Sequence, residues 1–259
     1  MTINSTQQLQ QYKEVAKIST GILFQLHQAI KAGVTPLEID RLADELCLKN
    51  QVVPCFKGVG VKGNEYRHAT CISVNDVVVH GIPDGRPFQS GDVIKVDFGI
   101  KKDGLLTDHC FTVGLAPLSQ EDERLIKVTK EAIENATKLA VVGKKVGDIG
   151  FAIESRVMQD GFSVAKEFIG HGIGHTMHDE PQVPAYGRKN AGDSLHEGSV
   201  LCIEAQILAG EDDLTQDNDG WTIRTRDGSK AAMFEYMVMV GKKKPVILTS
   251  TFGWPIIVS

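Results

Sequence analysis

Four carboxylates stand where the sequence is otherwise apolar, and they constrain the fold more than any other feature. Asp97 interrupts the run Val-Ile-Lys-Val-Asp-Phe-Gly-Ile, and Glu204 follows Val-Leu-Cys-Ile. Glu235 lies within Ala-Ala-Met-Phe-Glu-Tyr-Met-Val, and Asp108 follows Leu-Leu-Thr. A buried carboxylate without a partner either takes up a proton or destabilises the fold by several kcal/mol. The chain must therefore fold so that these four acids share a cationic partner.

A histidine-rich segment supplies a second kind of donor. His171, His175 and His178 fall within eight residues among glycines, although the whole chain has only eight histidines. The glycines disfavour a helix, and no Glu follows His171, so the HExxH zinc motif is absent. Carboxylate oxygens together with one imidazole suit divalent Mn, Fe, Co or Zn, and four acids could hold two such ions.

Composition excludes several classes of protein. The 259 residues are 42% hydrophobic and 24% charged, as expected for a globular protein with a sizeable core. A net charge of −5 gives no support for nucleic-acid binding. The five cysteines are odd in number and lack CxxC spacing, which favours reduced thiols in the cytoplasm. No apolar run reaches the roughly 18 residues of a membrane span. The chain also has no Gly-x-Ser-x-Gly elbow and no P-loop.

Helical periodicity and capping signals predict four helices. They cover 8–31, a segment that opens at Thr35 with a capping box to Glu38, 121–140 and 147–159. Residues 33–39 align weakly with 143–149 at an offset of 110 residues, each before a helix. Chance similarity between two helix starts is the competing interpretation. Because the acids also fall two per half, we expect two related α/β halves facing one site, in a single compact domain over 1–259.

Asp97 and Asp108 flank a hairpin signal at Lys101-Lys102-Asp103-Gly104. Directly opposed aspartates would require a turn centred between Lys102 and Asp103, whereas Asp103-Gly104 turn chemistry centres it about one residue later. We therefore expect a bulge that brings both carboxylates to one face. The alternative interpretation is a pair of surface aspartates, which suits Asp108 better than Asp97.

Several motifs taken together resemble methionine aminopeptidase of the bacterial type I form. They are Asn75-Asp76-Val77-Val78-Val79-His80-Gly81-Ile82-Pro83, the Asp97 and Asp108 pair, Gly170-His171-Gly172-Ile173-Gly174 with His178-Asp179-Glu180-Pro181, Ile203-Glu204 and Phe234-Glu235. Their order and spacing cover nearly the whole chain. The resemblance implies the pita-bread fold, an α/β (α+β) structure. In this fold two halves related by a pseudo-twofold axis form a central curved, mainly antiparallel sheet with helices outside.

The resemblance also implies a role for each candidate residue. Two divalent metal ions (Co, Mn, Fe or Zn) would be held by Asp97, Asp108, His171, Glu204 and Glu235. Glu204 would shuttle protons, His178 would bond the substrate carbonyl and His80 would contact the scissile amide nitrogen. The methionine side chain would lie against Cys71, Met177 and Trp221.

The implied substrates are nascent polypeptides with an N-terminal methionine and a small second residue. The implied setting is a cytoplasmic monomer, with the ribosome as a candidate docking partner.

Five features depart from the family's usual pattern. Tyr236 replaces His, Ala205 replaces Pro, His175 replaces Arg, and Thr107-Asp108-His109-Cys110 replaces the common Gly-Asp start. The loop from Phe56 to Cys71 is a few residues longer than usual and lacks the usual aromatic residues. These departures leave the metal ligands intact and bear on specificity and rate. Two other functions stay open here: an Xaa-Pro peptidase of the same fold, and a non-catalytic peptide-binding module.

Overall fold

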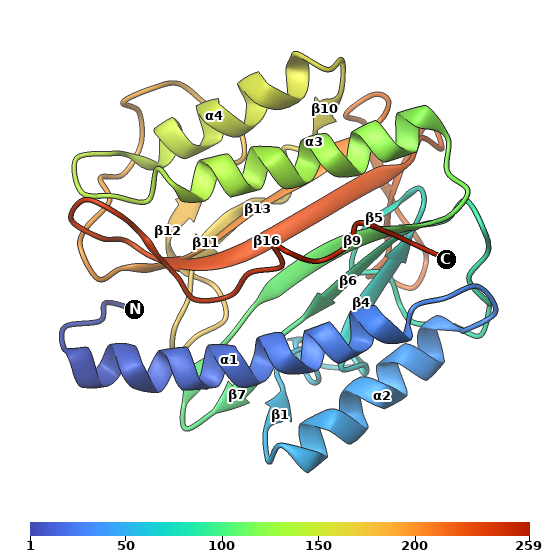
Figure 1. Ribbon diagram of the computed structural model, residues 1–259, viewed down its shortest axis with the longest axis horizontal. Coiled ribbons are helices and arrows are strands. Elements are labelled where there is room, and N and C mark those ends of the chain that lie inside the picture. Colours follow the sequence, from blue (N-terminus) through green and yellow to red (C-terminus); the bar gives the residue numbers. More distant parts are fainter.

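The computed structural model describes residues 1–259, and a ten-stranded sheet lies at its centre (Figure 1). Seven strands cross this sheet in the order Asp179–Val183 (β12), Gly170–Gly172 (β11), Val200–Leu208 (β13), Ala231–Met239 (β16), His109–Leu115 (β9), Val93–Phe98 (β6) and Thr70–Val74 (β4). Ser163–Val164 (β10), Val246–Ile247 (β17) and Ile257–Val258 (β18) pair with β13, β16 and β9. Only β18 runs parallel to its partner, so the sheet is mainly antiparallel, as expected.

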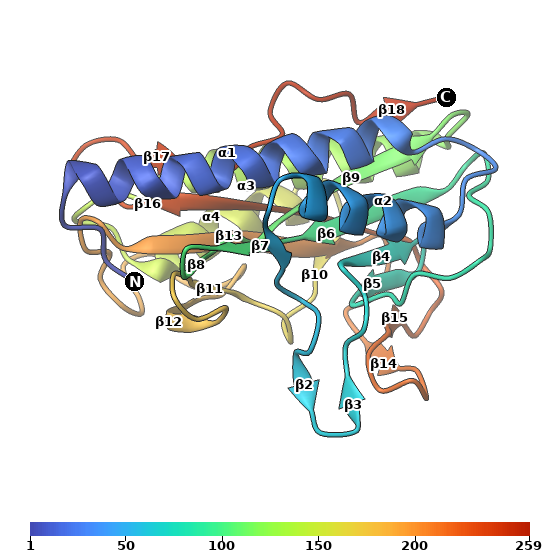
Figure 2. The same ribbon diagram turned by 90° about the horizontal axis from the view of Figure 1, so that it is seen from below.

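Three small sheets surround the large one. The first joins Val53–Pro54 (β1), Ile100–Lys102 (β7) and Leu105–Leu106 (β8), and the second joins Leu214–Gln216 (β14), Ile223–Thr225 (β15) and Val77–Val79 (β5). The third is the hairpin of Gly60–Val61 (β2) and Asn64–Glu65 (β3). This hairpin projects from the body of the molecule, on the side opposite the helices (Figure 2).

All four predicted helices form, with ends within a few residues of those expected. They are Thr6–Ala29 (α1), Pro36–Lys49 (α2), Gln120–Thr137 (α3) and Val146–Met158 (α4). The capping box at Thr35 and Glu38 is also confirmed, since each side chain bonds the backbone N–H of the other residue. None of the helices combines the length and hydropathy that a membrane span requires.

The two expected halves are confirmed by the helix starts. Helix α2 begins at residue 36 and α4 at residue 146, which is the offset of the sequence repeat. Lys145 N–H bonds the Asp148 carboxylate at 2.9 Å, repeating the contact of Thr35 N–H with Glu38 at 2.7 Å. In the view of Figure 1, helices α1 and α2 lie below the central strands and α3 and α4 lie above them, one pair for each half.

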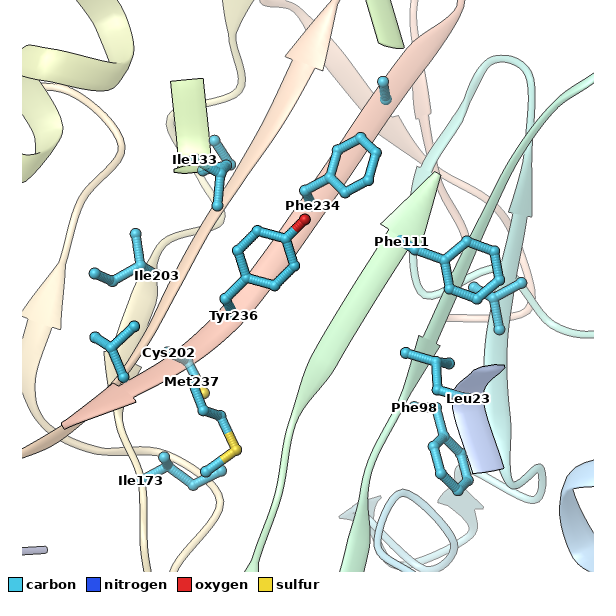
Figure 3. Close-up of a cluster of buried hydrophobic side chains, with 14 of the residues drawn as sticks. Leu23, Phe98, Phe111, Ile133, Ile173, Cys202, Ile203, Phe234, Tyr236 and Met237 are labelled. Carbon is cyan, nitrogen blue, oxygen red and sulfur yellow. The ribbon is translucent and has the colours of Figure 1, made fainter. Parts of the chain in front are cut away.

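Side chains alternate between the two faces of the central strands, so that one face packs in the core and the other faces the site. On β16, Phe234 and Tyr236 belong to the hydrophobic core together with Ile133 of α3 (Figure 3). Glu235, between them in the sequence, lines a cavity instead. Successive side chains of a strand point to opposite faces, so one buried acid can lie between two core aromatics. The apolar face joins 54 buried residues from both halves in one core.

The hairpin that carries Asp97 and Asp108 differs from its expected register. One register runs from the pair Val93 and Gly114 to the pair Lys102 and Leu105, with no residue inserted, so the expected bulge is wrong. Asp97 is paired with Cys110, two positions along from Asp108, and both carboxylates reach one cavity. They are therefore diagonal neighbours on one face, a spacing within reach of side-chain contact.

Candidate metal centre and peptide pocket

The five predicted metal ligands come from neighbouring strands of the large sheet. Glu204 on β13 is paired directly with Glu235 on β16, and Glu235 is paired with Cys110, which is also the partner of Asp97. His171 on β11 lies beside β13, and Asp108 immediately precedes β9. Residues far apart in the sequence thus meet because their strands are adjacent.

The donor atoms of these residues lie close together. His171 Nε2 is 3.9 Å from both Asp108 Oδ2 and Glu204 Oε1. Donor atoms of Asp108, His171, Glu235 and Cys202 all fall within 4.8 Å of one another. Cys202 was not among the candidate residues. It brings a buried thiol beside the carboxylates, because it stands two residues before Glu204 on the same face of β13.

The carboxylates lack partners within the protein. Buried oxygens of Asp97 (Oδ1), Asp108 (Oδ1) and Glu235 (Oε1) accept no hydrogen bond. Unsatisfied buried acceptors are rare in folded proteins and each calls for an explanation. Divalent cations supply one, since hard oxygen donors and one imidazole form a suitable ligand set for them. These residues therefore fit a metal centre.

Burial raises the pKa of all four acids, and repulsion by a neighbouring carboxylate adds to the rise in three of them. Burial, then the charge of Glu204, raises the pKa of Asp97 to about 8. Burial, then Asp97, raises the pKa of Asp108 well above its usual value, and burial, then Asp108, does the same to the pKa of Glu235. Burial raises the pKa of Glu204 to about 7. Without a cation, this cluster holds protons at neutral pH, so cations and protons compete for it.

Two further histidines adjoin the acids. The rings of His171 and His178 meet edge to face with centroids 4.5 Å apart. Burial and then the charge of His171 lower the pKa of His178. Burial and then His178 lower the pKa of His80 to about 4. Both imidazoles are therefore neutral near pH 7, and a neutral imidazole has one N–H donor and one acceptor nitrogen.

An apolar pocket continues from the histidines. Cys71, Met177 and Trp221, the three residues predicted to contact the methionine side chain, line the same cavity as the acids. The cavity has a volume of about 290 Å³ and is also lined by His80 and His178. All ten candidate residues thus meet in one place, with charged groups at one end and sulfur and aromatic groups at the other.

The long loop before Cys71 gives this pocket an aromatic wall. The loop has aromatic residues of its own at this place, because Phe56 and Tyr66 both line the cavity. Tyr66 meets Trp221 edge to face at 5.1 Å, and its hydroxyl donates to the carbonyl oxygens of Thr70 and Gly81. The insertion therefore keeps an aromatic contact at the pocket.

Most of the other departures lie away from the cavity. Tyr236 is buried on the opposite face of β16, where its hydroxyl pairs with Thr251 Oγ1 at 2.7 Å. Ala205 also belongs to the core. His175 is exposed and bonds the carbonyl oxygen of Gly104. His109 is buried behind Asp108, with Nε2 2.8 Å from Ser19 Oγ. None of these four residues lines the cavity, so the replacements alter the surroundings of the site and not its lining.

Sequence reasoning missed several lining residues, namely Phe56, Val59, Tyr66, Val79, Glu167, Phe168, Ile169, Gln206 and Met233. For Gln206 a signal was available, because a residue two positions after Glu204 on a strand shares its face. The others depend on how the chain packs around the cavity.

A larger hollow of about 600 Å³ lies near the start of α2 and is lined by five aspartates. Its acids are paired within the protein: Arg224 bonds Asp76 and Asp217, and Arg86 bonds Asp84. None of the ten candidate residues lines this hollow. We therefore assign the chemistry to the smaller cavity.

Comparisons with known proteins agree with this site. The sequence profile of metallopeptidase family M24 matches residues 10–242. Methionine aminopeptidase 1 of Bacillus subtilis is 35% identical over 237 residues, which cover 92% of this chain and 94% of the relative. Methionine aminopeptidase of Aquifex aeolicus is 37% identical over 252 residues, covering 95% and 97% of the two chains.

Solved structures show the same fold. Methionine aminopeptidase of Thermotoga maritima has a TM-score of 0.92 at 34% identity and covers 96% of this chain and 100% of that one. X-Pro aminopeptidase of the same organism has a TM-score of 0.74 at 21% identity and is covered over only 64% of its length, so it shows the shared fold alone. The pita-bread fold expected from the motifs is confirmed. The chain belongs to metallopeptidase family M24.

Proposed function

We propose that this chain is a metal-dependent methionyl aminopeptidase that removes the N-terminal methionine from polypeptides whose second residue is small. The observation that supports this most strongly is the single cavity in which unpartnered buried acids adjoin a sulfur-lined and aromatic pocket. The relatives that match over more than nine-tenths of the chain are named methionine aminopeptidases. The preference for a small second residue rests on the family resemblance alone.

Asp97, Asp108, His171, Glu204 and Glu235 would hold two divalent metal ions of Co, Mn, Fe or Zn. Bound metal of this kind lowers the pKa of water and polarises a carbonyl group. The fit rests on the orphaned carboxylate oxygens and on the short distances from His171 to Asp108 and Glu204.

The residues around the acids handle protons and orient the peptide. Glu204 is the proton-transfer group that the family resemblance implies, and its buried carboxylate lies beside His171, with Oε1 3.9 Å from Nε2. His178, neutral because its pKa is lowered, donates its N–H to the carbonyl oxygen as negative charge develops there. His80, also neutral, contacts the amide nitrogen of the scissile bond.

The methionine side chain lies between Cys71, Met177 and Trp221, whose sulfur and aromatic surfaces suit a thioether. In this proposal residues 1–259 form one catalytic domain, consistent with a core shared by both halves. It acts as a cytoplasmic monomer on nascent polypeptides, with the ribosome as the surface to which it would dock. These last points rest on the resemblance.

A metal titration followed by a peptide panel tests the proposal. The protein is loaded with Mn²⁺ and assayed on Met-Ala-Ser, Met-Leu-Ser, Leu-Ala-Ser and an Xaa-Pro peptide. We expect Met-Ala-Ser to be the best substrate. Preference for the Xaa-Pro peptide would indicate a proline-directed peptidase. Metal binding without any cleavage would indicate a peptide-binding module.

A further inference from the structure

Gln206 lies beside the metal centre and no role has yet been assigned to it. It follows Glu204 by two residues on β13, so both side chains point from the same face of the strand into the cavity. Its side chain is completely buried, with 0% exposure. Directly opposite on β16 stands Met233, which also lines the cavity.

The amide of Gln206 contacts one particular oxygen of Glu204. Its Nε2 donates a short hydrogen bond to Glu204 Oε2 and lies 3.6 Å from Met233 Sδ. The opposite orientation of the amide would place its oxygen against a carboxylate and repel it, so the nitrogen faces Glu204. The amide oxygen of Gln206 is buried and has no partner. The amide of Gln206 thus reaches only Glu204 Oε2 and, more weakly, the Met233 sulfur on β16, and both of these residues line the cavity.

The two oxygens of Glu204 have different surroundings as a result. Oε2 is held by Gln206, whereas Oε1 lies 3.9 Å from His171 Nε2, which is itself 3.9 Å from Asp108. Oε1 is thus the oxygen that faces the other ligands. Groups that hydrogen-bond a ligating carboxylate fix its orientation and affect metal affinity.

We propose that Gln206 is a positioning residue of the metal centre: it holds Oε2 of Glu204 so that Oε1 is presented beside His171. This inference rests on the proposed function, since it assumes that Glu204 ligates a metal ion. Removing the amide would free Glu204 to rotate and would weaken the binding of an ion that Glu204 helps to hold.

The test compares metal binding in the wild type and in Gln206→Met, which removes the donor at nearly constant side-chain length. Mn²⁺ is titrated calorimetrically into metal-free protein, and kcat and KM are measured on Met-Ala-Ser. We expect the affinity for one of two ions to fall by about 10–100-fold, the usual effect of losing such a partner. We expect kcat to fall while KM changes little, because the methionine pocket is untouched.

Two further variants separate positioning from packing. In the double variant Gln206→Met with Met233→Gln the amide moves to the directly opposed position, beside the same carboxylate, and we expect it to restore affinity and kcat. Gln182→Met is the matched control: Gln182 is paired with His171 in the sheet, but its exposed side chain bonds no ligand. This control should bind Mn²⁺ and turn over like the wild type.

The possible outcomes separate failure of the inference about Gln206 from failure of the proposed function. Unchanged affinity and kcat in Gln206→Met overturn the inference, as does a loss that the double variant fails to restore. If Gln206→Met does not fold, as judged by thermal melting of the metal-free protein, the double variant alone decides. A wild type that binds no Mn²⁺ and cleaves no Met-Ala-Ser would overturn the proposed function itself, whereas an active wild type leaves only Gln206 in question.

Discussion

At the scale of single residues, the proposed function assigns Glu204 two roles, metal ligand and proton-transfer group. Burial raises its pKa to about 7, while Gln206 holds one of its oxygens. We predict that Glu204→Gln keeps the fold but lowers kcat on Met-Ala-Ser by at least ~10²-fold, the usual effect of losing such a group. Circular dichroism and metal analysis of the same sample are the controls. Turnover close to that of the wild type would refute the role.

Lys95 gives a second prediction, on stability. Its side chain is buried on β6, and its ammonium donates to the carbonyl oxygens of Asn75 and Ala231 at 2.9 and 2.8 Å. Burial lowers the pKa of Lys95 from 10.5 to about 7. The unfolded chain therefore binds the proton more tightly between about pH 7 and pH 10.5, so this group makes the protein more stable as pH rises through that window.

The measurement is the free energy of unfolding by guanidinium chloride, taken from pH 7 to pH 10 in the wild type and in Lys95→Met. Other groups titrate in this range, so the difference between the two proteins isolates Lys95. We expect the wild type to gain stability relative to Lys95→Met as pH rises. Parallel curves would show that the lysine has an ordinary pKa in the folded state.

At the scale of elements, the residues that flank the hairpin β2–β3, Phe56, Val59 and Tyr66, line the cavity together with Trp221. A Cβ at Gly60 would stand 2.6 Å from Trp221 Cζ2 and 2.9 Å from the carbonyl oxygen of Asn64. We predict that Gly60→Ala displaces the hairpin from Trp221 and lowers kcat/KM for Met-Ala-Ser by ~10-fold, within the range for altered hydrophobic pockets.

Gly63→Ala is the matched control for this change. Gly63 has φ +93° and Gly60 has φ +113°, so alanine is strained at either position, but a Cβ at Gly63 meets nothing within 4 Å. The assay is kcat/KM on Met-Ala-Ser and Leu-Ala-Ser for both variants. Equal losses in the two would mean that backbone strain, rather than contact with Trp221, explains the effect.

The elements also show what local sequence can determine. The helix starts were predicted well because capping boxes such as Thr35 with Glu38 are local signals. The register of the hairpin that carries Asp97 and Asp108 was not predicted well, because the two aspartates were taken to be directly opposed, whereas they are diagonal neighbours. Within the loop from Phe56 to Cys71, the hairpin β2–β3 was not predicted, since its approach to Trp221, far along the sequence, is not visible in its own residues.

At the scale of the whole molecule, each half supplies two of the four acids to one centre. Sequence indicated these acids because each lies in or beside an apolar segment, and His171 and His178 because they belong to a histidine cluster. It did not reveal Cys202, Gln206 or Met233, which look like ordinary strand residues until β13 and β16 are seen side by side. Family resemblance, rather than spacing, assigned the roles, while the cavity depends on tertiary packing.

The shared centre implies that metal stabilises the folded chain as a whole. Strands from both halves contribute ligands, so unfolding destroys the site and releases the ions. We predict that free Mn²⁺ at 100 times its Kd raises the free energy of unfolding by about 2.7 kcal/mol per site. Thermal melts with Mn²⁺ and with chelator check this, and Asp108→Asn serves as the comparison. A melting temperature that is insensitive to metal would contradict a shared centre.

The most direct test of the central claim is hydrolysis of Met-Ala-Ser by metal-stripped and reconstituted protein. Elemental analysis first confirms that chelation has removed the metal, and Mn, Fe or Co is then added back to the same preparation. The unpartnered buried oxygens of Asp97, Asp108 and Glu235 predict that the stripped protein is inactive and that addition of metal restores release of methionine. Full activity in protein shown to be free of metal would contradict the account.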